Sequence, residues 1–366
     1  MEPSMKVNKP ALNSLRWLKK AWFAIQAPLI AIVGGLLIGA LIMLITGHNP
    51  IDAYSEMLEG AVGGRNSANL VSTINRSAPI IGMGIAASIA FRAGMFNIGG
   101  EGQLVLGGVA AALTAVYVPL PPILLVPLAL IAAALAGGLY ALMAAFFEFK
   151  FNVPLLVSTL LLNYPARYFT SYLVTHPFRD VASGMNQTFQ VPENIRFALL
   201  GENTQLHAGL FITLTIVILA AFIINRTVPG YEVRMTGLNA RFSRYGGIRS
   251  KKVGYWSMFL SGAVAGTVGA IEILGVIYRY VDGALTLPLY AWTGIMTALL
   301  SGSSPFGVLA AGLFFSAVQT GGFGMERKTD VVRELSRVLQ AIIIMLVAAR
   351  ASFQFGKQKD TVEDES

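Results

Sequence analysis

Long apolar runs alternate with short polar loops along most of the chain. A helix needs about 20 apolar residues to cross the hydrocarbon of a bilayer, and several of the runs reach that length. The pattern predicts an all-α, polytopic integral membrane protein with about ten transmembrane helices. We expect these helices at residues 21–46, 77–91, 96–118, 122–147, 153–175, 206–225, 253–275, 287–300, 305–322 and 331–350.

Lysine and arginine gather in two segments, residues 1–20 and residues 226–252. Short cytoplasmic loops of membrane proteins carry an excess of these residues, so we expect residues 226–252 and both termini to lie in the cytoplasm. The chain then divides into a cytoplasmic segment at 1–20, a transmembrane domain at 21–350 and a charged cytoplasmic tail at 351–366. The composition of the tail predicts disorder.

Composition agrees with a membrane protein and removes other classes. Of the 366 residues, 55% are hydrophobic and 13% are charged, and the mean hydropathy is +0.63. The net charge of +8 resides largely in short loops, so it does not indicate nucleic-acid binding. The chain has no cysteine, which excludes disulfides and thiolate metal ligands, and its three histidines are too far apart to form a local metal motif.

A glycine-rich stretch at residues 91–108, FRAGMFNIGGEGQLVLGG, differs from the apolar runs around it. It carries Asn97, Glu101 and Gln103, and a carboxylate at membrane depth costs about 2.5–3.5 kcal/mol. A broken helix inside a bilayer is tolerated only where protein or a cavity surrounds it. We interpret the stretch as an interior element with a polar lining. The alternative is a cytoplasmic loop followed by an ordinary glycine-rich packing helix.

Polar side chains also interrupt the run at residues 153–175, which carries Asn163, Tyr164, Pro165 and Arg167 near its middle. The proline predicts a kink, and the arginine needs a partner or water at this depth.

Two later runs carry features of their own. Small residues recur at 261–269, a pattern that predicts close packing of helices. Trp292 lies in the run at 287–300, and its ring can stack on a flat ligand. The tryptophan could equally serve packing or lie at the membrane interface.

The basic loop at residues 226–252 contains a second informative stretch. Two short elements flank a turn at Gly237, Leu238 and Asn239, and a short helix from Asn239 to Tyr245 is capped by that asparagine and closed by glycines 246–247. Such a helix could dock into another protein, or the loop could be basic only for reasons of topology. The docking interpretation places four apolar side chains on one helical face: Leu238, Phe242, Tyr245 and Ile248.

No pattern of catalytic residues is present. The chain has no phosphate-binding loop, nucleophile elbow or metalloprotease motif. The ionisable residues within the runs are scattered, at Arg92, Glu101, Arg167 and Glu272. We therefore expect a protein that is not an enzyme.

Several of these stretches resemble one known family. GMFNIGGEGQLVLGG resembles the signature of ABC importer permeases for nucleosides and simple sugars, which are related to branched-chain amino-acid permeases. GLNARFSRYGGI is similar to the cytoplasmic coupling segment of that family, and SGAVAGTVGAIEILG and PFGVLAAGLFF look like two of its later spans. The resemblance covers about residues 78–350. It implies that the transmembrane domain is an ABC importer permease domain.

The sequence departs from the family pattern at three places. The family often has Asn-x-Glu-Val where this chain has Asn152-Val153-Pro154-Leu155, although the following Leu-Asn-Tyr remains. Phe242 and Ser243 stand where two alanines are usual, and residues 301–304 replace a turn rich in leucine and glycine. These changes put the substrate in doubt and leave the class unaffected.

The resemblance implies a multi-pass protein of a bacterial or archaeal cytoplasmic membrane. It would act with a second permease chain, identical or paralogous, with ABC ATPase subunits that bind ATP and Mg²⁺, and with an extracytoplasmic substrate-binding protein. No cofactor is expected in this chain. The implied contacts to the ATPase are Gly237, Leu238, Asn239, Phe242, Arg244, Tyr245, Gly247 and Ile248. The candidates for the translocation path are Asn97, Glu101, Gln103, Asn163, Tyr164 and Trp292.

Two other classes stay open on the sequence alone. An ion-coupled secondary transporter of a small polar solute can work with few intramembrane ionisable residues. A membrane scaffold or assembly factor would carry no substrate at all.

Overall fold

The computed structural model describes residues 26, 29–64, 68–201 and 204–346. The predicted N-terminal segment at 1–20 and the predicted tail at 351–366 lie outside these residues. Helices dominate the described chain, and its only β-structure is two isolated bridges, Gln187–Val281 and Leu199–His207. The all-α prediction is confirmed for this part of the protein.

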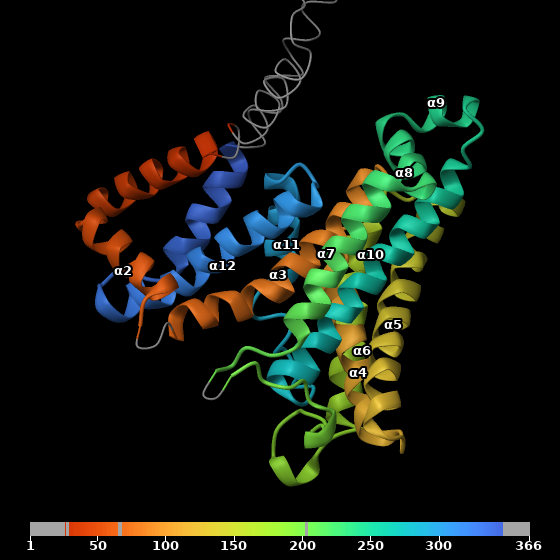
Figure 1. The fold of residues 1–366 in the computed structure, drawn as a ribbon, viewed down its shortest axis with the longest axis horizontal. Helices are drawn as coiled ribbons and strands as arrows, with labels where there is room; N and C mark the ends of the chain where they lie inside the picture. The colour runs from red at the N-terminus through yellow and green to blue at the C-terminus, as the bar shows by residue number, and fades with distance from the viewer. Residues whose placement is uncertain (1–25, 27–28, 65–67, 202–203, 347–366) are drawn as a thin grey trace, which may run out of the picture.

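The helices follow the predicted apolar runs in order (Figure 1). Their bounds are Leu29–Ile45, α2 Pro50–Val62, α3 Ala68–Arg92, α4 Gly100–Tyr117, α5 Pro122–Phe151, α6 Leu155–Thr175, α7 Gly209–Arg226, α8 Val228–Leu238, α9 Ala240–Tyr245, α10 Ser250–Glu272 with a π-helical end at Ile273–Ile277, α11 Tyr290–Leu300 and α12 Pro305–Lys328. Short 3-10 turns lie at Val181–Ser183 and Glu193–Ile195, and a last helix occupies residues 334–346.

Five of the described helices are long and apolar enough to cross a membrane: α3, α5, α7, α10 with its π-helical end, and α12. The helix Leu29–Ile45 and α11 are shorter but also apolar. Large apolar side chains such as Leu139 on α5 and Phe222 on α7 are exposed, which suits contact with lipid. These helices support a multi-pass membrane protein, and the number of about ten spans stays a prediction.

Helices α4, α5 and α10 pack together through their backbones. Gly107 of α4 and Gly137 of α5 both lie against Gly266 of α10, so no side chain fits between the helices there. Gly262 of α10 meets Gly137 in the same way. The predicted close packing at residues 261–269 is confirmed, because glycine lets the backbones approach.

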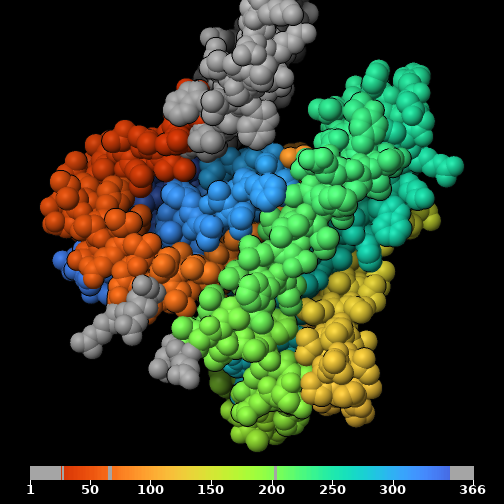
Figure 2. Space-filling view, viewed as in Figure 1, coloured from red at the N-terminus to blue at the C-terminus, as the bar shows by residue number. Residues whose placement is uncertain are grey.

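Helix α3 joins two groups of helices. It packs against α10 on one side and against α11 and α12 on the other. Figures 1 and 2 show α4 to α10 gathered on one side of the molecule and α2 with α12 on the other. A shift of α3 therefore acts on both groups.

The prediction of a short span at residues 77–91 is wrong, because α3 begins at Ala68 and has 25 residues. Its polar first half is helical because α12 provides partners. Nε of Arg76 donates to Oε1 of Gln319 at 3.1 Å, and the guanidinium carbon lies 5.3 Å from the centre of the Phe323 ring. Helix α12 itself continues to Lys328, past the predicted end of its span.

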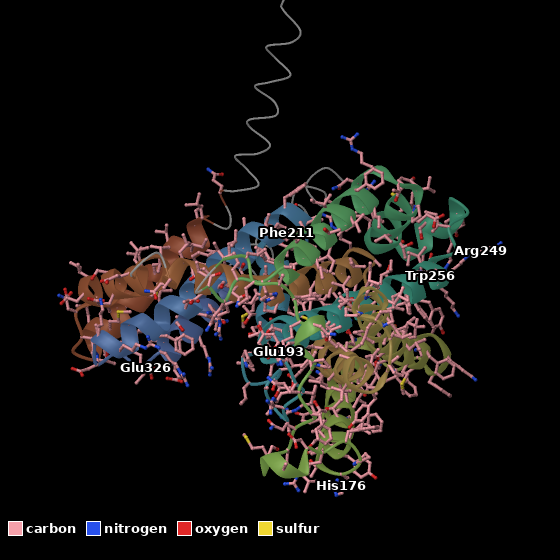
Figure 3. The ribbon with its side chains drawn as sticks, turned by 60° about the horizontal axis from the view of Figure 1, so that its bottom comes forward. His176, Glu193, Phe211, Arg249, Trp256 and Glu326 are labelled. Carbon is pink, nitrogen blue, oxygen red and sulfur yellow. The ribbon has the colours of Figure 1, made fainter. Side chains whose placement is uncertain are left out.

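The two long polar segments lie at opposite ends of the α4 to α10 group. Helices α8 and α9 stand at one end, and residues 176–201 and 204–205 form the irregular other end (Figure 1). Figure 3 shows the same separation between Arg249 and His176.

Candidate functional site

A cleft of about 760 Å³ opens between α3, α4, α6, α11, α12 and the segment that precedes α11. We name it the Glu101 cleft. Its lining comprises Arg76, Glu101, Leu160, Asn163, Tyr164, Arg167, residues 286–289, Trp292, Phe323, Arg333 and Arg337. Four of the six side chains that the sequence suggested for a pathway thus line one hollow, although they come from three different helices.

Glu101 lies in the first turn of α4 and pairs with an arginine of α6. Its Oε1 is 3.5 Å from Nη1 of Arg167. The glutamate side chain is 11% exposed and the arginine side chain 50%, so the pair sits at the wall of the cleft with the guanidinium facing the open side. A carboxylate in the first turn of a helix also interacts favourably with the helix dipole. The sequence predicts that Arg167 needs a partner or water at this depth, and the structure shows that its partner is Glu101.

Asn163 holds the start of α4 in place. Its Oδ1 accepts a hydrogen bond from the backbone N–H of Gly102 at 2.8 Å, and its Nδ2 donates to the carbonyl of Ile98 at 3.2 Å. The hydroxyl of Thr159 accepts from the N–H of Ile98. Helix α6 thus satisfies the irregular backbone just before α4, as a broken element inside a membrane requires.

Asn97 and Gln103 do not reach the cleft. Nδ2 of Asn97 donates to Oε1 of Gln103 at 3.0 Å and to the hydroxyl of Ser261 at 2.9 Å, and Nε2 of Gln103 donates back to Oδ1 of Asn97 at 3.1 Å. Both side chains are buried. Their amides attach the start of α4 to α10, and neither side chain lines the cleft.

Two aromatic side chains flank the polar part of the cleft. Tyr164 on α6 is 53% exposed and Trp292 on α11 is 37% exposed. Ring faces that remain this accessible can stack on a flat or apolar ligand surface.

Sequence reasoning missed three arginines of the cleft, Arg76, Arg333 and Arg337. Arg76 directly precedes the predicted span at residues 77–91, because the start of α3 is polar. Arg333 and Arg337 are four residues apart, a spacing that places two side chains on the same side of a helix. This spacing is the feature of the sequence from which the pair could have been predicted. The guanidinium carbon of Arg333 lies 5.3 Å from the centre of Phe323, on which Arg76 also stacks.

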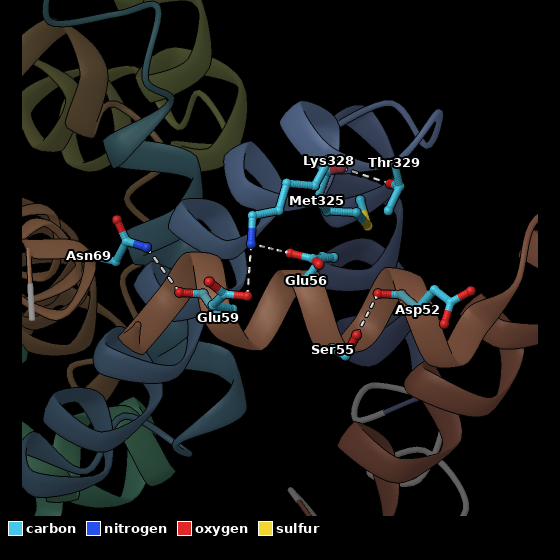
Figure 4. A network of polar contacts seen from close by, with 8 residues as sticks. All are labelled: Asp52, Ser55, Glu56, Glu59, Asn69, Met325, Lys328 and Thr329. Carbon is cyan, nitrogen blue, oxygen red and sulfur yellow. Dashed lines mark hydrogen bonds and ion pairs between the residues drawn. The ribbon is translucent and has the colours of Figure 1, made fainter. Parts of the chain in front are cut away.

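A second hollow of about 440 Å³ lies between α2, α3 and α12. Lys328 closes one side of it, with its Nζ 2.8 Å from Oε2 of Glu56 and 2.8 Å from Oε2 of Glu59 (Figure 4). Asn69 donates to the carbonyl of Glu59. These contacts fasten α2 to α12 and α3.

The basic loop contains the short helix that the sequence predicted. Oδ1 of Asn239 accepts from the N–H groups of Arg241 and Phe242 at 3.0 and 2.9 Å, which is the predicted cap of α9. Gly247 follows the helix with a φ of +81°, a conformation that favours glycine. The predicted turn is shorter than expected, because Gly237 and Leu238 end α8 and only Asn239 separates the two helices.

The prediction that Leu238, Phe242, Tyr245 and Ile248 share one exposed apolar face is wrong for Ile248. Leu238, Phe242 and Tyr245 are exposed at 81%, 63% and 91%. Ile248 is only 9% exposed, because α9 ends at Tyr245 and the chain then turns back, with the N–H of Ile248 bonded to the carbonyl of Ser243.

The loop contacts several membrane helices, and one of these contacts lies at a glycine. Gly237 lies directly against the carbonyl of Arg92 at the end of α3, where no Cβ could fit. Nε of Arg92 in turn donates to the carbonyl of Ser303, in the turn before α12, at 2.7 Å. The end of α8 is therefore in contact with α3, and α3 is bonded to the turn before α12. Side chains of these two helices, Arg76 and Phe323, line the Glu101 cleft.

Residues 69–348 match the family model described as branched-chain amino acid transport system / permease component. A guanosine ABC transporter permease protein of Bacillus subtilis is 36% identical over 340 residues, which cover 91% of this chain and 96% of that protein. A nucleoside ABC transporter permease protein of Lactococcus lactis is 31% identical, over 89% of this chain and 91% of that protein. A glucose ABC transporter permease protein of Haloferax volcanii is 31% identical, over 91% and 90%.

Proposed function

Because the chain belongs to the family of permease components of branched-chain amino acid transport systems, we propose that it is the permease subunit of an ATP-driven importer and that the Glu101 cleft lines its substrate pathway. A nucleoside is the first substrate class and a simple sugar the second, in line with the substrates named for the three similar permeases. The chain carries solute and does no covalent chemistry of its own.

One observation carries this proposal. Glu101, Asn163, Tyr164 and Trp292 come from α4, α6 and α11 and line one hollow. Ligand sites combine aromatic walls with a few placed polar groups, and intramembrane ionisable residues mark pathways for polar solutes. The exposed aromatic rings would contact the base or the sugar ring, and the charged pair Glu101–Arg167 would hydrogen-bond to its polar edge.

The assembly proposed here has two permease chains, two ATPase subunits that bind ATP and Mg²⁺, and an extracytoplasmic binding protein, in a bacterial or archaeal cytoplasmic membrane. The α8–α9 segment would lie in the cytoplasm and dock into a groove of the ATPase. Its exposed Leu238, Phe242 and Tyr245 support this, because exposed apolar side chains on a small helix suit burial in a partner.

The docked segment would pass the movement of the ATPase to the cleft. Gly237 meets the backbone of α3, and Arg92 connects α3 to the turn before α12. Closure of the ATPase would therefore bias α3 and α12 between two arrangements, as a remote ligand biases a two-state element.

Uptake by the reconstituted transporter tests the proposal. The chain is purified with its ATPase and binding-protein partners, placed in proteoliposomes and supplied with labelled nucleosides and glucose. We expect nucleoside uptake that requires ATP and the binding protein. Uptake driven by a proton or sodium gradient in the absence of the ATPase would establish an ion-coupled carrier instead, and no flux of any solute would favour a scaffold.

A further inference from the structure

The Glu101 cleft is rich in hydrogen-bond donors. Arg76, Arg167 and Arg337 line it, and each guanidinium carries five N–H donors and no acceptor. Trp292 adds an indole N–H, which also only donates. A ligand that fills this cleft must therefore bring acceptors.

Two of these arginines are already held in place. Arg76 donates through Nε to Gln319 and stacks on Phe323, and Arg167 reaches Glu101 through Nη1. Each of these polar contacts engages one nitrogen of its guanidinium, so further N–H groups are available at the cleft. Donors held in this way lose little conformational entropy when a ligand binds.

The acceptors on the cleft walls are few, and most are engaged. Oδ1 of Asn163 accepts from the N–H of Gly102, and the carboxylate of Glu101 pairs with Arg167. Among the described lining side chains this leaves Oε2 of Glu101 and the hydroxyl groups of Tyr164 and Thr286. The excess of donors over acceptors is a property of the cleft as a whole.

Carboxylates offset two of the four arginines of the cleft. Glu101 offsets Arg167, and Nε of Arg333 lies 3.4 Å from Glu334 and 3.9 Å from Glu326. A phosphate site gains most from guanidinium groups that have no other carboxylate beside them. Arg76 and Arg337 have no ion pair among the described residues, so the cleft offers many donors to carbonyl oxygens, and a nucleoside monophosphate is a necessary competitor in the test.

We infer that the Glu101 cleft selects nucleosides whose base carries a ring carbonyl, such as hypoxanthine, guanine or uracil, over bases with an amino group at the same position. The inference rests on the proposed function. An arginine can donate two parallel hydrogen bonds to O6 and N7 of an oxopurine. In adenine an amino group replaces O6, so an N–H donor of the base would face an N–H donor of the guanidinium. Trp292 and Tyr164 provide accessible ring faces on which the base can stack.

Matched substrates and variants test this selectivity in the complete transporter, with its ATPase and binding protein, in proteoliposomes. Inosine and adenosine carry a carbonyl or an amino group at the same purine position, and uridine and cytidine do so at one pyrimidine position. We expect the unaltered transporter to prefer inosine and uridine. Arg76→Gln and Arg337→Gln should each lower the ratio of inosine to adenosine uptake about tenfold, roughly the discrimination that one good arginine–base contact provides.

The binding protein is the same in every preparation, so a changed ratio reports the permease. Arg327→Gln is the matched control, because Arg327 is an exposed arginine that lines the second hollow and not the Glu101 cleft. It should leave the ratio unchanged. If a glutamine variant fails to assemble, Arg337→Lys keeps the charge but loses the planar fork, and it should still lower the ratio.

Equal uptake of both members of each pair by the unaltered transporter would overturn the inference, and so would an unchanged ratio in the arginine variants. Inosine monophosphate that competes better than inosine would also overturn it, since the arginines would then recognise negative charge. A transporter that carries glucose and no nucleoside at all would instead refute the proposed nucleoside function.

Discussion

Gly237, at the end of α8, lies against the backbone carbonyl of Arg92, at the end of α3, with no room for a side chain between them. Helix α3 also carries Arg76 into the Glu101 cleft. One helix, α3, therefore connects the α8–α9 segment with the proposed substrate site. We therefore expect this contact to pass movement of the loop to the cleft.

Gly237→Ala should uncouple ATP hydrolysis from transport. The new Cβ would collide with the Arg92 carbonyl, and overpacking of this kind typically costs about 1–3 kcal/mol. We expect ATP hydrolysis to continue while uptake falls. Gly246→Ala is the control, because its added Cβ would meet only the Ser243 carbonyl at 3.4 Å, an ordinary contact. Full uptake by Gly237→Ala would show that the contact does not transmit movement.

Glu101→Ala should impair transport or assembly and leave membrane insertion intact. The change removes the partner of Arg167, whose guanidinium then faces the cleft without its carboxylate. Uptake and ATPase co-purification measure the effect at equal amounts of protein in the membrane. Glu193→Gln is the control, because Glu193 pairs with Arg196 in an exposed position and such pairs contribute little. An uptake rate for Glu101→Ala equal to that of the unaltered protein would contradict the role of the pair.

Much of the fold is readable from the sequence because membrane helices must be long and apolar, and because their close-packed seams need small residues. The cap of α9 is readable for a local reason, since Asn239 bonds to the two backbone N–H groups that follow it. The start of α3, by contrast, cannot be predicted from the sequence. Its polar residues look like a loop until α12 is placed beside them and Gln319 accepts from Arg76.

The candidate site also combines features that the sequence predicts with features that it does not predict. The sequence shows that polar groups in a membrane segment need partners, but it does not show which partners. Asn97 and Gln103 look like lining residues, and they satisfy each other. Glu101 looks similar, and it pairs with Arg167 at the edge of an open cleft. Only the packing of α4 against α6 and α10 separates the two cases.

Phe242→Ala together with Leu238→Ala should release the ATPase or uncouple it. Both side chains are largely exposed in this chain, so they are available for burial in a partner. An apolar anchor near the centre of an interface typically contributes about 2 kcal/mol or more, which is roughly thirtyfold in affinity. Arg241→Ala should have a smaller effect that depends on salt, since charges at the rim of an interface mainly change the association rate.

Ile248→Ala serves as a contrast to those two changes. Ile248 is buried within the loop, so its truncation should lower the stability of the loop and should not remove a contact with the ATPase. Co-purification, ATPase stimulation and uptake that all survive the double change at Leu238 and Phe242 would leave the segment as a basic loop with a role in topology only.

Cysteine labelling should place the α8–α9 segment in the cytoplasm and residues 176–205 outside. The chain has no cysteine, so a single introduced thiol reports one position. Tyr245 and Val181 are suitable sites because they are 91% and 79% exposed, whereas Ser250 is buried and bonded to Ser243. The excess of Lys and Arg around α9 predicts that a reagent that cannot cross the membrane reaches Val181→Cys and not Tyr245→Cys in intact cells. After the cells are opened both should react, which shows that each thiol is accessible. Labelling of Tyr245→Cys from outside would reverse the orientation, and the ATPase could then not dock on this segment.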